Sequence, residues 1–251
     1  MRELPIAPPP SAADIGLVTA LPMEIAPFLA RLRGVRKYHA RKLTIVEGEL
    51  GGKLIVVVLT GMGRIRAQRG AEALLDGHRP RWLVSAGYAG ALNPSLKRNE
   101  IVLADEVVNI EGRRFSIDVK VPETSRAEGI HAGRLLTTDS VARTALEKQG
   151  LREKFSADVV DMETSAIAAL AGERGVRFLS IRVVSDEAGV NLPPEILSIV
   201  GETGSVRLGA AVGSLLKRPG ALKDLLRLRE HAKQAADRLS SFLVETLATL
   251  N

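Results

Sequence analysis

The stretch that most constrains the fold is residues 158–189, DVVDMETSAIAALAGERGVRFLSIRVVSDEAG. Residues 158–160 are Asp, Val and Val, and the two β-branched valines are typical of the end of a strand. From Asp161 the segment is rich in alanine, with apolar residues at three- and four-residue spacing, and Gly175 ends it, which predicts a helix. Residues 178–184 form a mostly apolar run, which is typical of a strand covered on both faces in an α/β protein.

Charged residues stand at both turns of this strand–helix–strand unit. Asp161 and Glu163 lie where the first strand becomes the helix, and Arg182 and Asp186 lie near the end of the second strand. Ligands bind at the carboxyl ends of strands in open α/β sheets, so we expect carboxylates from two strand ends in one crevice. The alternative is structural, with Asp161 as an N-cap and Glu163 as a favourable charge in the first helical turn.

Length and composition favour a single α/β domain. The chain has 251 residues, 45% of them hydrophobic, which allows a substantial core. Strands alternate with helices, without a repeat or a linker, so residues 15–251 are predicted to form one domain. Residues 1–14 contain four prolines and are predicted to be a flexible tail.

Composition also argues against several classes of function. There is no cysteine, which fits a reducing compartment and predicts a cytoplasmic protein, and the four histidines lack metal-ligand spacing. No apolar run is long enough to span a bilayer. The net charge is +6 but aromatics are only 3%, so no nucleic-acid partner is predicted. Much of the excess positive charge lies in the predicted C-terminal helices. We interpret it as a solvated helix face, and the alternative is a surface that binds weakly to acidic membranes.

Other strand ends also carry polar residues and glycines. Residues 15–20 form an apolar strand that leads to Glu24 at the start of a helix. The strand at residues 53–59 ends in Gly61 and Gly63 before another helix, and such glycines suit the close approach of an anion. A dinucleotide fingerprint would need glycine where Arg66 stands, so that interpretation is weak.

The remaining elements are read from periodicity and turn residues. Gly-Gly at residues 51–52 predicts a hairpin between residues 43–49 and 53–59. Residues 111–129 are polar and irregular, and are expected to form a loop or hairpin near the site. Asp139 or Ser140 is predicted to cap a helix that runs to about Lys148. Further strands are expected at residues 80–90, 101–110 and 134–138, and further helices at residues 202–216 and 221–250.

Five segments, each at a strand end, resemble one family. They are IGLVTALPMEIAPF, LTGMGRIRAQRGAEALL, LVSAGYAGALNPSLKRNEIVLADEV, VDMETSAIA and RVVSDEAG. In this order they are similar to the purine nucleoside phosphorylases and methylthioadenosine/S-adenosylhomocysteine nucleosidases, over most of residues 15–190. The resemblance implies a phosphorylase/hydrolase-like α/β fold, with a central mixed twisted sheet flanked by helices. It also implies cleavage of the N-glycosidic bond of a purine nucleoside, with adenine favoured as the base.

The resemblance implies roles for the residues around the base and the sugar. Asp186 is expected to donate a proton to purine N7 as the bond breaks, and Ser185 to orient it. General-acid help of this kind is worth about 10²–10⁴-fold. Glu163 is expected to accept hydrogen bonds from the ribose hydroxyls, with Met162 packed against the sugar.

The nucleophile is left open between water and phosphate. Glu24 matches the acidic residue that activates water in the nucleosidases, and Arg182 matches the arginine beside that water. Phosphorylases instead bind phosphate near glycines and arginines, and no metal or organic cofactor is implied in either case. The residues that qualify for a phosphate site are Gly61, Gly63, Arg64 and Gly87.

Two departures from the family pattern affect the predicted pocket. Tyr88 stands where the nucleosidases have glycine, and their base-stacking phenylalanine is replaced near Val141. Residues 191–226 resemble phosphorylases associated with hopanoid biosynthesis, so removal of adenine from adenosylhopane is an alternative function. A non-catalytic nucleoside-binding protein is the alternative of another class. Family members commonly form dimers, trimers or hexamers, which predicts a homo-oligomer.

Overall fold

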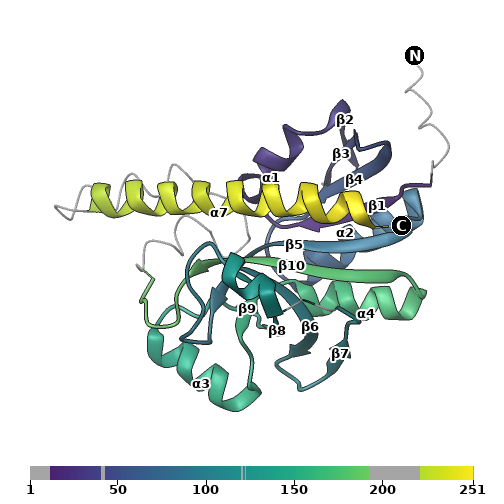
Figure 1. Ribbon diagram of the computed structural model, residues 1–251. Coiled ribbons are helices and arrows are strands. Elements are labelled where there is room, and N and C mark those ends of the chain that lie inside the picture. The colour runs from purple at the N-terminus through teal and green to yellow at the C-terminus, as the bar shows by residue number, and fades with distance from the viewer. Residues whose placement is uncertain (1–11, 41–42, 120, 122, 193–220, 251) are drawn as a thin grey trace, which may run out of the picture.

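The computed structural model describes residues 12–40, 43–119, 121, 123–192 and 221–250 (Figure 1). Helices and strands alternate in part of the chain, as the sequence predicts, but β2, β3 and β4 follow one another directly, as do β5, β6 and β7. The elements are β1 (Ile15–Thr19), α1 (Pro22–Leu29), β2 (Arg33–Ala40), β3 (Leu43–Leu50), β4 (Lys53–Leu59), α2 (Arg64–His78), β5 (Trp82–Ala91), β6 (Ile101–Asn109), β7 (Arg114–Ser116), a 3₁₀ helix (Glu123–Glu128), β8 (Ile130–Thr137), α3 (Ala145–Phe155), β9 (Val159–Asp161), α4 (Thr164–Arg174), β10 (Arg177–Asp186) and α7 (Ala221–Thr249).

The strands of the described residues form one mixed sheet with a closed part. β10 pairs with β5 on one side and β6 on the other, and β6, β8, β9 and β5 pair in turn, so these five strands close a ring. β1, β4, β3 and β2 extend from β5 as a wing. The predicted class, an α/β fold with a mixed central sheet, is confirmed. The closure was not predicted, and it leaves those five strands without a free edge.

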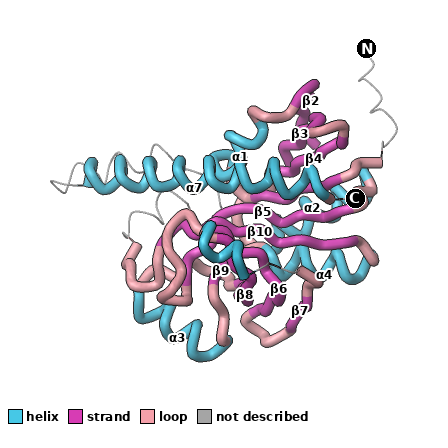
Figure 2. The backbone as a smooth tube through the Cα atoms, viewed as in Figure 1, coloured by secondary structure: helices cyan, strands magenta, loops and turns pink. Residues whose placement is uncertain are grey.

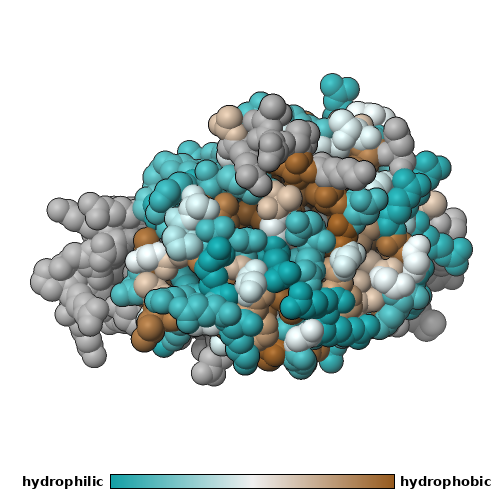
Figure 3. All heavy atoms as spheres, turned by 60° about the horizontal axis from the view of Figure 1, so that its bottom comes forward, coloured by the Kyte–Doolittle hydropathy of each residue, from teal (hydrophilic) through white to brown (hydrophobic). Residues whose placement is uncertain are grey.

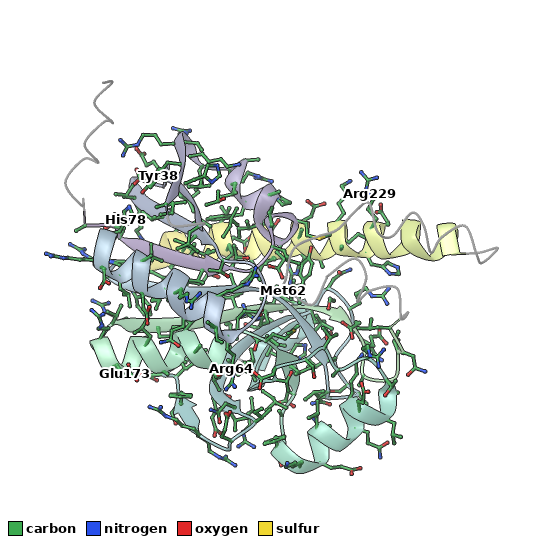
Figure 4. All side chains as sticks on the ribbon, turned by 180° about the vertical axis from the view of Figure 1, so that it is seen from behind. Tyr38, Met62, Arg64, His78, Glu173 and Arg229 are labelled. Atoms are coloured by element: carbon green, nitrogen blue, oxygen red, sulfur yellow. The ribbon has the colours of Figure 1, made fainter. Side chains whose placement is uncertain are left out.

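Helices cover both faces of the sheet. α1 and α7 lie across the face seen in front in Figure 1, and α2 and α4 lie on the opposite face, seen from behind in Figure 4. On the α1 and α7 side, Phe28 and Leu243 pack against Leu17, Val84 and Ile181 of three strands. All five side chains are fully buried, and each such burial contributes roughly 1.5–3 kcal/mol.

The opposite face has its own apolar layer. Leu74 of α2 and Ile167 of α4 pack against Val18, Val58 and Leu83 on strands β1, β4 and β5. Because these strands are buried on both faces, their sequences are continuous apolar runs rather than alternating ones. Figure 2 shows the helices in cyan on both sides of the magenta strands. Figure 3 shows one face of the molecule, which is mainly hydrophilic with scattered apolar side chains.

The β3–β4 hairpin agrees with its prediction, whereas the start of α3 does not. Gly51 and Gly52 both have positive φ, 58° and 81°, as the tight turn requires. Asp139 or Ser140 as the cap of α3 is wrong. Thr144 caps the helix, because its Oγ accepts from Glu147 N while the Glu147 carboxylate accepts from the Thr144 backbone. The helix also continues beyond the predicted end, to Phe155.

Other differences concern polar segments. β2 was not predicted, because its side chains are almost all exposed and its sequence lacks alternation. Residues 111–129 contain the short strand β7 and the 3₁₀ helix. The last two residues of the predicted flexible tail are held by the domain. Ala13 is buried, and Asp14 accepts a hydrogen bond from Leu54 N at 2.9 Å. Residues 1–11 and the helix predicted at 202–216 lie outside the described residues.

The packing of α2 against β4 allows a test with two glycines of one helix. Alanine normally stabilises a helix by up to about 1 kcal/mol relative to glycine. A Cβ at Gly77 would meet nothing within 4 Å, whereas a Cβ at Gly70 would collide with the Thr60 side chain. We therefore expect Gly77→Ala to raise the free energy of unfolding in urea and Gly70→Ala to lower it. Equal effects of the two substitutions would contradict this packing.

Candidate active site

Glu24 is fixed at the first turn of α1 by three hydrogen bonds. Its Oε2 accepts from Leu21 N at 2.8 Å and Thr19 Oγ1 at 3.1 Å, and its Oε1 accepts from Tyr88 N at 3.1 Å. The side chain is buried, and this desolvation raises the pKa of the carboxyl above its ordinary value, against the opposing effect of the hydrogen bonds and of Arg182. Glu24 therefore stabilises the helix start and also lines a pocket.

Glycine at position 87 makes room for this carboxylate. A Cβ there would lie 3.1 Å from Glu24 Oε1, tighter than an ordinary contact. The hydroxyl of the next residue, Tyr88, donates to Ala232 O of α7 at 2.6 Å. Burial raises the pKa of the Tyr88 hydroxyl. The tyrosine that departs from the family pattern thus links α7 to the site.

Arg182, on β10, forms a buried network with residues of β5, β9 and α4. Its Nη2 lies 2.8 Å from Asp161 Oδ2 and donates to Ser85 Oγ at 2.7 Å and Thr164 Oγ1 at 2.6 Å. Asp161 also accepts from Thr164 N at 3.0 Å and from Thr137 Oγ1 at 2.8 Å. Asp161 thus accepts from the first N–H of α4 and pairs with Arg182 as well, but the N-cap residue of α4 is Glu163, not Asp161 as the structural alternative had it.

Glu163 faces the loop between β4 and α2. Its Oε1 accepts from Gly63 N at 2.7 Å, and its Oε2 lies 3.3 Å from its neighbour Met162 N. Burial, together with the nearby carboxylates of Asp161 and Glu24, raises the pKa of Glu163 to about 8. Glu163 is therefore mainly protonated in the free protein at neutral pH.

A pocket of about 230 Å³, part of it open to solvent, lies between these groups. Of the residues that the sequence singled out, the pocket brings together Glu24, Arg182, Glu163, Gly87 and Tyr88. Its other lining residues were not predicted. They are Val18, Thr19, Ala20, Thr60, Ser85, Ala86 and Ile167.

Asp186 does not line this pocket. It lies at the end of β10, nearly buried, and its Oδ1 accepts from Ser185 Oγ at 2.6 Å. Its Oδ2 lies 2.5 Å from the Nζ of Lys148, and a Cβ at Gly90 would lie 3.2 Å from the same oxygen. Sequence reasoning missed Lys148, although its spacing from the partly buried Leu151 and Phe155 places it on the inner face of α3.

Of the four residues predicted for phosphate, Gly87 lines the pocket, whereas Arg64, Gly61 and Gly63 are engaged with other groups. Arg64, the first residue of α2 (labelled in Figure 4), pairs with Asp139 at 2.8 Å and Glu111 at 3.1 Å. Gly61 N donates to Ala20 O, and Gly63 N donates to Glu163. An anion would therefore have to displace carboxylates from the donors that this loop offers.

Two further observations concern the surroundings of the site. Val141 is partly buried in the loop before α3, outside the pocket lining. Among the residues that the structure describes, no group of three or more His, Cys, Asp or Glu side chains is arranged to hold a metal ion. No helix in the described part of the chain is long and apolar enough to cross a membrane.

The sequence matches a family model over residues 14–216, that of the phosphorylase superfamily. The chain belongs to the phosphorylase superfamily. The predicted resemblance is thus confirmed at the level of the superfamily. Similar superfamily members include a 5′-methylthioadenosine/S-adenosylhomocysteine nucleosidase of Geobacillus kaustophilus, 28% identical over 69% of this chain and 84% of that protein. The corresponding nucleosidase of Marinomonas sp. is 27% identical over 77% of this chain and 96% of its own.

Solved structures of this superfamily share the fold. The nucleosidase from Neisseria meningitidis, in complex with methylthio-immucillin-A, superposes with a TM-score of 0.73 at 20% identity, covering 94% of this chain and 99% of that one. The nucleosidase from S. pneumoniae with a transition-state inhibitor gives a TM-score of 0.71 at 20% identity, over 94% and 99% of the two chains. These similarities show the fold.

The Arg182–Asp161 pair predicts a large difference between two arginine substitutions. Arg182→Met leaves the Asp161 carboxylate buried and unpaired, and removal of one partner of such a pair costs about 3–5 kcal/mol. Arg174→Met is the matched control, because Arg174 makes an exposed ion pair with Asp76, worth at most about 1 kcal/mol. Urea unfolding of the two variants and the wild type measures how much each substitution lowers the free energy of unfolding. A loss of less than about 1 kcal/mol for Arg182→Met would contradict the role of the pair.

The raised pKa of Glu163 predicts how stability depends on pH. Its carboxyl binds a proton in the folded state up to about pH 8 but loses it near its ordinary pKa of 4.5 in the unfolded chain. The resulting stabilisation is complete below pH 4.5 and is lost as the pH rises to about 8. In urea unfolding, the stability of Glu163→Gln should fall less between these pH values than that of the wild type, whereas Glu173→Gln, at an exposed site of α4, should not differ. Parallel curves for Glu163→Gln and wild type would refute the shift.

Proposed function

We propose that this chain hydrolyses the N-glycosidic bond of an adenine nucleoside, with Glu24 as the base that activates water. The observation that carries the proposal is the Glu24 carboxylate, buried at the wall of the pocket that Arg182 and Glu163 also line. The relatives named 5′-methylthioadenosine/S-adenosylhomocysteine nucleosidases support it. They make a nucleoside with a 5′ thioether the first substrate to test.

The hydrogen bonds of Glu24 suit a general base. An ionised carboxylate offers about four lone-pair positions. Thr19, Leu21 and Tyr88 occupy three of them and fix the orientation of the group, which leaves one for a water in the pocket. Burial raises the pKa of Glu24 toward the range in which a carboxylate accepts a proton from attacking water effectively.

Water is favoured over phosphate by the charges next to the pocket. The pocket carries the acidic side chains of Glu24 and Glu163, and Arg182 is already paired with Asp161. Arg64 is paired with carboxylates as well. A phosphate dianion would therefore meet no unpaired cation among these residues, and an ionised Glu24 would repel it, because like charges at short range in a poorly solvated site are unfavourable.

The reaction balances with the groups present. Water attacks C1′ and loses a proton to Glu24, while the electron pair of the C1′–N9 bond departs with the base. Asp186 protonates the base at N7, with Ser185 holding the carboxyl. Glu163 binds the ribose hydroxyls, and its carboxylate form stabilises the positive charge that develops on the sugar. Met162, its neighbour in the chain, packs against the sugar.

The remaining predictions concern the alternative functions, the assembly and the location. The hopanoid alternative depends on residues 191–226, most of which lie outside the described residues, and a non-catalytic nucleoside-binding role would need none of the three acids. A homo-oligomer remains a prediction, as does the cytoplasmic location. The membrane-surface contact rests on basic C-terminal residues of which Arg229 (labelled in Figure 4) and Lys233 are exposed on α7, whereas Arg238 donates to Glu128 O.

The proposal is tested by adenine release from adenosine, methylthioadenosine and S-adenosylhomocysteine, each with and without phosphate. We expect release without phosphate, and Glu24→Gln should lower kcat about 10²–10⁴-fold, because the amide cannot accept the proton of water. Glu173→Gln, an exposed substitution, serves as the control. Release that requires phosphate would refute hydrolysis, and normal turnover of Glu24→Gln would refute the role of Glu24.

A further inference from the structure

Lys148 is a fully buried lysine that the proposed reaction does not yet use. Its side chain has no exposed surface, although lysine is almost never fully buried unless it is paired. It lies on the inner face of α3, which runs beside the segment that follows β10 (Figure 1). Its burial requires partners for the ammonium group, and these partners define what the residue can do.

Within the described part of the chain, Lys148 Nζ has three hydrogen-bond partners. It lies 2.5 Å from Asp186 Oδ2, 2.8 Å from Glu187 O and 3.1 Å from Val190 O. An ammonium group has three donors and no acceptor, so these three acceptors match its charged form. An ammonium of Lys148 beside a carboxylate of Asp186 therefore leaves no donor of the lysine without an acceptor.

The same geometry also satisfies the other protonation state of the pair. If the proton between Nζ and Oδ2 moves to Asp186, the neutral amine still donates to Glu187 O and Val190 O. Its lone pair then accepts from the new carboxylic acid of Asp186. The proton can thus pass between Nζ and Oδ2, two atoms 2.5 Å apart, without rearrangement of any partner.

We propose that Lys148 is a positioning residue that holds Asp186 in place and stores the proton that Asp186 passes to the departing purine. The proposal rests on the proposed function, since it needs a leaving base. Ser185 holds the other oxygen of Asp186 at 2.6 Å, so the carboxylate is gripped from both sides.

Protons and electron pairs balance in this transfer. As the C1′–N9 bond breaks, its electron pair stays on the base, which becomes an anion. Asp186 delivers a proton to N7 and receives the proton of Lys148 Nζ, which leaves a neutral amine beside a carboxylate. After the base has left, a proton from solvent reaches Lys148 through Asp186. This arrangement lets an aspartate that is ionised beside an ammonium act as an acid.

The other ionisable groups around the pair have partners of their own. The carboxylate of Glu187 lies 3.9 Å from Lys97 Nζ and accepts from the backbone of Arg98. On α3, Glu147 accepts from backbone N–H groups at the start of its own helix. From α7, His231 contacts the Arg98 guanidinium at 2.9 Å. Among the described residues, Lys148 is thus the cation in direct contact with Asp186.

The test is the pH profile of kcat for Lys148→Met, with the adenine nucleoside that the wild type cleaves fastest. At about pH 8 we expect kcat to fall by about 10²-fold, because Asp186 then lacks its proton. Solvent protonates a carboxylate directly as the pH falls, so the ratio of the kcat of the variant to that of the wild type should rise with decreasing pH. Glu24 and Glu163 are present in both proteins, so their effects on kcat cancel in the ratio of the two kcat values.

Two comparisons separate this role from a merely structural one. Asp186→Asn should lose activity at every pH, because an amide cannot be protonated in this range. In that background Lys148→Met should cause no further loss of kcat, since Lys148 acts through Asp186. Lys154→Met, at an exposed position of the same helix, should behave as the wild type.

If Lys148→Met fails to fold, Lys148→Arg replaces it. This variant keeps a cation but cannot release a proton, so it should lose activity at about pH 8 as well. The proposal would be overturned if either variant kept the kcat of the wild type. It would also be overturned by a loss of kcat that is the same at all pH values, or by a further loss when the substitution is made in the Asp186→Asn background. If the wild type releases adenine from no nucleoside, the proposed function fails and this inference fails with it.

Discussion

The buried ion pair between Arg182 and Asp161 is the interaction on which the rest of the structure depends. The arginine belongs to β10 and the aspartate to β9, two strands of the closed ring that do not pair with each other. Ser85 of β5 and Thr164 of α4 complete the network. An unpaired charge inside the ring would be costly, so this network fixes how the strand ends meet. The same strand ends carry the side chains of the pocket.

The sequence predicts the α/β class, the long apolar strands and most residues at their ends, because burial on both faces leaves a continuous apolar run. The family resemblance also implies that Glu24 and Glu163 belong to one site, and both line the pocket, although β9 before Glu163 runs antiparallel to β5 and therefore opposite to β1 before Glu24. Features that depend only on spacing along the chain are therefore well predicted. The turn at Gly51 and Gly52 and the end of α4 at Gly175 belong to this group.

Features that depend on contacts between residues far apart in the chain cannot be predicted from the local spacing of residues. The ring closes because β10 pairs with two strands, and nothing in the residues of β10 specifies the second pairing. Lys148 meets Asp186 across 38 residues, and Ser85 meets Arg182 across 97. The polar strand β2 lacks any apolar signal. The cap of α3 was missed for a local reason, since Asp139 is an equally good capping type and only the Thr144–Glu147 pair distinguishes the true start.

The charges of the site favour a cationic transition state. The pocket and its border hold the carboxyl groups of Glu24, Asp161 and Glu163, with Arg182 as their shared cation. This excess of acid raises the pKa of Glu163 in the free protein, which means that the site keeps one carboxyl neutral at a cost in stability. A sugar with developing positive charge relieves this repulsion, because it favours the ionised form of Glu163. The arrangement that destabilises the empty site is therefore the one that would stabilise an oxocarbenium-like state within it.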